Sequence, residues 1–81
     1  MTEEEALAKI NEAILSAVDD AEPVSIEQDL KEDDVLDSLD MISFLFELEE
    51  STGLKFPEGD LDDHGLYKIS NLINYICEKA K

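Results

Sequence analysis

Apolar residues recur at helical spacing near both ends of the chain. From Leu7 to Val18 they stand three and four positions apart, which places them on one face of a helix. The preceding Thr2-Glu3-Glu4-Glu5 has the form of a capping box, in which a hydroxyl and a carboxylate satisfy the unpaired donors of a helix start. A second amphipathic helix is predicted near the C-terminus, with an apolar stripe of Leu66, Ile69, Leu72, Ile73 and Ile76.

The stretch from Ser38 to about Ser51 is apolar around most of a helical circumference. Only Glu49 interrupts the apolar side, and Gly53 suits a left-handed cap after the helix. We expect neighbours on two or more sides, as for the central helix of a bundle. The opposite, narrow polar arc comprises Asp40, Ser43, Glu47, Glu50 and Ser51.

Two other segments complete the predicted fold. Residues 19–37 are mostly polar and form a long loop, with isolated apolar residues to hold it: Val24, Ile26, Leu30, Val35 and Leu36. Residues 57–64 suit one short helical turn closed by Gly65. We therefore expect an all-α fold, a small bundle of three main helices plus a short helical segment before the last helix. With 81 residues, the chain 1–81 is predicted to be a single domain.

The charge of the chain restricts its partners. Its 22 acidic residues against 6 basic ones give a net charge of -16, which argues against binding nucleic acid and favours partners with basic patches. No stretch approaches the roughly 18 apolar residues of a membrane span, so no membrane insertion is expected. Cys77 is the only cysteine, which excludes an intramolecular disulfide, and the acidic N-terminus lacks a signal core. These features favour a cytoplasmic protein.

Ser38 lies in Asp37-Ser38-Leu39, where the long loop enters the middle helix. It is either the N-cap or the first residue of that helix. On position alone, a plain capping serine is the simplest interpretation, because serine is among the preferred N-caps.

The wider pattern resembles the acyl carrier protein family over essentially the whole chain. It consists of D-S-L-D at a helix start, an acidic and apolar helix ending in Leu48-Glu49-Glu50, a short loop with Pro57, and a final helix ending in residues 73–76. The resemblance implies that Ser38, between Asp37 and Leu39, carries 4'-phosphopantetheine, transferred from coenzyme A by a Mg-dependent phosphopantetheinyl transferase. A helix N-terminus also favours the negative charge of a phosphodiester.

By this resemblance the chain is a monomeric carrier and not an enzyme. The thiol of the arm would hold acyl chains as thioesters and present them to fatty-acid, lipid or polyketide biosynthetic enzymes. Acyl synthases and acyltransferases with basic patches would dock on the middle helix, through Asp40, Ile42, Phe46, Glu47 and Glu50. A sheltered acyl chain would be lined by Leu30, Leu45, Leu48 and Leu66. The alternatives are a solvated face for the first set and an ordinary core for the second.

Several positions depart from the family pattern. The family usually has a Leu-Gly pair shortly before the motif, but here the run is Asp33-Asp34-Val35-Leu36-Asp37. Ser43 stands where an acidic residue is common, Glu47 where a small residue is common, and Lys68 replaces a threonine that often caps the last helix. These departures favour a specialised carrier. Aminoacyl carriers, such as those loaded with D-alanine, share the fold and the serine and remain an alternative.

Other classes of function are also open. Asp60, Asp62 and Gly65 occupy the first, third and sixth positions of a calcium-binding loop, but His64 at the fifth and Asn71 at the twelfth do not fit, so no metal site is expected. His64 is the only histidine, and no G-x-S-x-G surrounds Ser38, which argues against a hydrolase. An unmodified acidic adaptor remains as a further alternative.

Overall fold

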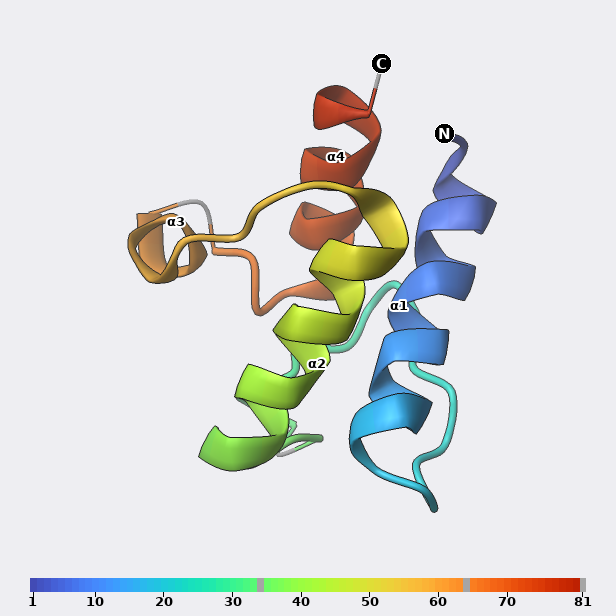
Figure 1. Cartoon of the computed structure of the whole chain (residues 1–81), viewed down its shortest axis with the longest axis vertical. Coiled ribbons are helices and arrows are strands. Elements are labelled where there is room, and N and C mark those ends of the chain that lie inside the picture. The colour runs from blue at the N-terminus through green and yellow to red at the C-terminus, as the bar shows by residue number, and fades with distance from the viewer. Residues whose placement is uncertain (34, 64, 81) are drawn as a thin grey trace.

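The computed structural model describes residues 1–33, 35–63 and 65–80, with the side chains of Ser38, Glu58, Asp60 and Asp62 outside the description. Within these ranges the chain forms four helices: α1 (Glu3–Ala17), α2 (Ser38–Thr52), α3 (Glu58–Asp63) and α4 (Ile69–Lys79). In Figure 1, α1 and α2 run side by side, and α3 lies across α2 from α1. The predicted all-α class, the short third helix and the long first connection are confirmed.

Local capping groups predicted from the sequence act at two helix ends. Oγ1 of Thr2 accepts a hydrogen bond from the Glu5 N–H at 3.2 Å and donates one to Oε1 of Glu5 at 3.2 Å. At the other end of the next helix, Gly53 has a φ of 74° and donates its N–H to the Glu49 carbonyl at 2.8 Å. Lys68 precedes α4 without a capping side-chain hydrogen bond. Thr2 and Gly53 therefore cap the helix ends that the sequence pattern assigned to them, whereas α4 begins without a side-chain cap.

The core is built from all four helices and from the long loop. Its fully buried large side chains include Ile10, Ile14, Leu30, Phe44, Leu48, Leu66, Ile69, Leu72, Ile73 and Ile76. Leu66 belongs to this core but precedes α4. The prediction that it is part of the apolar stripe of the last helix is therefore wrong.

The expectation that the middle helix is the centre of the bundle is wrong. It is α1 that packs against both α2 and α4. Along α2, Leu39, Ile42 and Phe46 remain 76%, 67% and 57% exposed. The broad apolar pattern of this helix therefore combines a core face with an apolar face that no described residue covers.

The long loop between α1 and α2 is held by hydrogen bonds. The Leu30 N–H donates to the Tyr67 carbonyl at 2.8 Å, and the Ile69 N–H donates to the Gln28 carbonyl at 3.0 Å. Oδ1 of Asn11 accepts the Val24 N–H at 2.8 Å. Of the residues expected to hold the loop, Val24, Leu30 and Leu36 are buried and Val35 is half-buried, whereas Ile26 is 41% exposed. The loop therefore lies against the start of α4.

The sequence predicted neither a membrane span nor a metal site. No helix in the described ranges is long and apolar enough to cross a membrane. Within the same ranges, no group of three or more His, Cys, Asp or Glu residues could hold a metal ion. His64 and the side chains of Asp60 and Asp62, on which the calcium alternative depends, lie outside the described residues.

Candidate functional site

The start of α2 is capped by Asp37. Its Oδ1 accepts the Asp40 N–H at 2.8 Å, and its carbonyl accepts the Met41 N–H at 2.9 Å. The backbone of Asp37 is extended, with a φ of -83° and a ψ of -176°, as an N-cap requires. Of the two positions that the sequence allowed, Ser38 therefore occupies the first position of the helix, and the capping role belongs to its neighbour.

The spacing along α2 places position 38 on a particular face of the helix. Positions 41, 45 and 49 follow it by three, seven and eleven residues, so the four positions share one face. At 1.5 Å per residue, position 49 lies about 16 Å along the helix axis from position 38. The face that begins at Ser38 thus continues for three turns.

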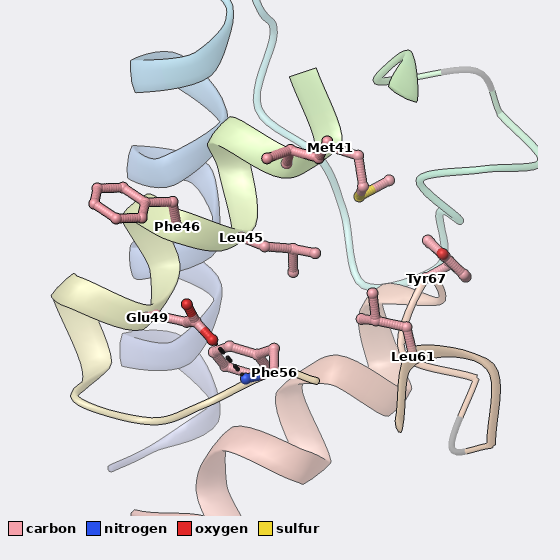
Figure 2. A pocket seen from close by; sticks show the side chains of 8 residues that line it. Met41, Leu45, Phe46, Glu49, Phe56, Leu61 and Tyr67 are labelled. Carbon is pink, nitrogen blue, oxygen red and sulfur yellow. Dashed lines mark hydrogen bonds between the residues drawn. The ribbon is translucent and has the colours of Figure 1, made fainter. Parts of the chain in front are cut away.

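This face of α2 forms one wall of a pocket with a volume of about 530 Å³. The opposite wall comes from the segment after α2, from α3 and from the residue two positions before α4 (Figure 2). The lining residues are Met41, Ile42, Leu45, Phe46, Glu49, Phe56, Leu61 and Tyr67. Seven of the eight are apolar or aromatic, so the pocket suits an apolar ligand.

Glu49 is the one carboxylate among these lining residues. Its Oε2 accepts the Phe56 N–H at 2.8 Å, drawn as the dashed line in Figure 2. This bond ties the last turn of α2 to the segment that forms the opposite wall. The sequence pattern signalled Glu49 only as an interruption of the apolar side, and neither its hydrogen bond nor its place in the pocket was predicted.

Comparison with known proteins decides the family. The chain is 32% identical over 80 residues to an acyl carrier protein of Rubrobacter xylanophilus, an alignment that covers 96% of this chain and 95% of the relative. This chain belongs to the acyl carrier protein family. Acyl carrier proteins from two strains of Campylobacter jejuni, RM1221 and 81-176, are each 37% identical over 62 residues, covering 76% of this chain and 78% of each relative. No family model matches the chain. No solved structure matches it either.

Four residues were expected to line an acyl pocket: Leu30, Leu45, Leu48 and Leu66. Leu45 lines the pocket beside α2. Leu30, Leu48 and Leu66 are at most 1% exposed and lie in the core, away from the described lining. These three side chains belong to the core. On α2, the pocket is lined by the residues around Leu45, and its opposite wall is formed by Phe56, Leu61 and Tyr67. The sequence pattern did not predict a role for Phe56, Leu61 or Tyr67 in a pocket.

The residues expected to bind partner enzymes lie on accessible parts of α2. Ile42, Phe46 and Glu50 are exposed, and Asp40 and Glu47 are half-buried. Leu39, which the resemblance placed beside the modified serine, is the most exposed large apolar residue at 76%. Leu39, Ile42 and Phe46 follow one another at spacings of three and four, so they form a continuous apolar stripe, here called the α2 stripe, along the accessible side of the helix.

Proposed function

We propose that this chain carries acyl groups on a 4'-phosphopantetheine arm attached to Ser38. One observation carries the proposal beyond membership of the family: Asp37 caps α2, so capping does not account for a serine at the next position. That position also opens the helix face that lines the pocket. The proposed attachment point therefore lies at the start of the helix face that lines a mostly apolar pocket.

The start of α2 fits the phosphodiester of such an arm. The positive end of the helix dipole favours a negative group there, and N–H groups of the first turn point toward it. When attached, the arm supplies a thiol that holds acyl groups as thioesters. The chain's own thiol, Cys77, is half-buried against the core, which suits a structural role.

The pocket beside α2 is the place where a short acyl chain would be sheltered. Met41, Leu45, Phe56 and Leu61 offer apolar walls to such a chain. Burial of a methylene group contributes about 0.8 kcal/mol, so even a few methylene groups would hold the chain in the pocket.

The α2 stripe is proposed as the surface on which partner enzymes dock. Exposed apolar side chains at helical spacing provide a few contacts that hold a complex, and the surrounding acids speed the encounter with basic partners. The partners would be a phosphopantetheinyl transferase, acyl synthases and acyltransferases. In this role the chain is a carrier and not itself an enzyme, in accordance with its family. A cytoplasmic location remains a prediction.

The attachment is tested by intact mass. The protein is incubated with coenzyme A, Mg²⁺ and a phosphopantetheinyl transferase, and one phosphopantetheine per chain is the expected gain. Ser38→Ala abolishes the gain, whereas Ser43→Ala, an exposed serine of the same helix, retains it. No gain in the parent protein, or a gain that survives Ser38→Ala, contradicts the proposal.

The kind of cargo needs a separate assay. The protein with a free phosphopantetheine thiol is offered to an acyl-carrier-protein synthetase with fatty acids and to an adenylating enzyme with amino acids. Loading of fatty acyl groups is expected, because the pocket lining is mostly apolar. Exclusive loading of amino acids would replace the acyl cargo by the aminoacyl alternative.

A further inference from the structure

Glu49 is the only charged side chain among the described residues that line the pocket. We propose that Glu49 selects the cargo by charge: it accepts chains whose distal end is apolar or donates a hydrogen bond, such as a hydroxyl or an ammonium group, and it excludes chains that end in a carboxylate. This inference rests on the proposed function, because it supposes that the cargo is attached at Ser38.

The position of Glu49 gives it access to the far end of a cargo. It lies three turns of α2 beyond Ser38 on the same face, about 16 Å along the axis. Met41 and Leu45 lie between the two positions and also line the pocket. With the thioester beside Met41, a chain that extends along the wall of α2 would meet the carboxylate last.

The hydrogen bond to Phe56 fixes the carboxylate in this wall. Oε2 is held by the Phe56 N–H at 2.8 Å, while no described residue donates to Oε1. Figure 2 shows the two oxygens pointing in different directions from the end of the side chain. Oε1 thus keeps its capacity to accept a hydrogen bond from a cargo, and the carboxylate is held in place before the cargo arrives.

The surroundings strengthen the effect of this charge. A cargo chain packed against Leu45, Phe56 and Leu61 would displace water beside Glu49, which weakens dielectric screening. No lysine is among the described lining residues. The Lys31 ammonium stands 5.4 Å from the centre of the Tyr67 ring, and Lys55 lines a separate pocket on the other side of Glu49 and Phe46. A cargo carboxylate would therefore face Glu49 without a counter-ion in the lining.

A purely structural role for Glu49 can be separated from this selection. Glu49→Gln keeps a side-chain oxygen that can accept the Phe56 N–H but removes the negative charge. Glu47→Gln is the matched control, because it removes one charge from the same helix at a half-buried position outside the described pocket lining.

The test compares cargoes of one length. Ser38 is loaded from coenzyme A thioethers that carry a hexyl, an aminohexyl or a carboxypentyl chain, and intact mass confirms each product. The Tm of each form is then measured at about 0.15 M salt, where the Debye length of about 8 Å removes most distant charge effects. The carboxypentyl form is expected to melt about 4–8 °C below the hexyl form, and the aminohexyl form at or above it.

The two variants decide the cause. In Glu49→Gln the difference between the carboxypentyl and aminohexyl forms should disappear, whereas in Glu47→Gln it should persist. Equal Tm values of the two charged cargoes in the parent protein, or an unchanged difference in Glu49→Gln, overturn the selection by Glu49. Failure to load Ser38 at all overturns the proposed function itself, and the mass measurement distinguishes that result from the others.

Discussion

Asp37 and Ser38 are neighbours in the chain, and the structure assigns the stability of the helix start to the first of them. The Asp37 side chain binds the Asp40 N–H, so Asp37→Ala leaves that donor without its partner. We expect a loss of about 1 kcal/mol in the free energy of unfolding. Urea unfolding followed by circular dichroism measures it.

Two other substitutions act as controls for the cap. Asp37→Asn should retain most of the stability, because asparagine is an equally good N-cap. Ser38→Ala should change the free energy of unfolding by less than about 0.5 kcal/mol while abolishing the mass gain. A loss in Ser38→Ala as large as that in Asp37→Ala would show that the serine contributes to the cap.

Phe44 and Phe46 offer a second comparison between neighbouring residues of α2. Phe44 is fully buried, whereas Phe46 is 57% exposed in the α2 stripe. Phe44→Ala should therefore lose about 3–5 kcal/mol, from lost burial and from the cavity left behind. Phe46→Ala should lose less than half as much in urea unfolding, yet should slow acyl transfer by a partner synthase. Similar losses of stability in both variants would contradict this division between core and docking surface.

At the scale of the elements, glycine has opposite effects at the end of α2 and inside α3. Gly53 adopts a φ of 74°, and an added Cβ would meet no atom within 4 Å, so Gly53→Ala carries only the backbone cost. That cost is about 1 kcal/mol. Gly59 lies within α3 with equal space around it, and Gly59→Ala should stabilise the protein by about 0.5 kcal/mol.

Thermal unfolding of the two alanine variants measures this contrast. The Tm should fall for Gly53→Ala and rise for Gly59→Ala. A fall of equal size in both would show that backbone conformation is not the cause.

The helices were predictable because their signals are local. Thr2, Gly53 and Gly65 each act within one turn of their own position, and their predicted roles match the helix ends that form. The bonds between residues 28–30 and 67–69 carry no such signal, since they join backbone groups far apart in the sequence. The same holds for Glu49 and Phe56, whose contact depends on the path of the chain after α2.

At the scale of the whole molecule, the net charge of -16 acts against the compact state. Raising the sodium chloride concentration from about 0.01 M to about 1 M shortens the Debye length from about 30 Å to about 3 Å, so the Tm should rise. Sodium chloride and potassium chloride should act equally if screening is the cause. A Tm that is independent of salt would show that the repulsion is negligible.

Periodicity did not reveal which apolar residues of α2 are buried. A helical pattern records that a position is apolar, not whether the core or a partner covers it. Leu39 and Ile42 contributed to the expectation of a central helix in the same way as Phe44 and Leu48, yet the first two are exposed and the second two are fully buried. Leu48 is a similar case: it lies one position away from the pocket-lining Glu49 but is fully buried, and its role in lining an acyl pocket stays a prediction.

In the proposed function, the cap at Asp37 also bears on how the transferase recognises its target. Since the side chain of Asp37 already completes the first turn of α2, this turn need not become ordered when a transferase binds. Docking onto a preorganised helix avoids the entropy loss of folding a peptide on the enzyme surface. The enzyme could then recognise the shape of a preformed helix start rather than the amino-acid sequence around Ser38. Such recognition would allow it to modify carriers whose sequences have diverged widely.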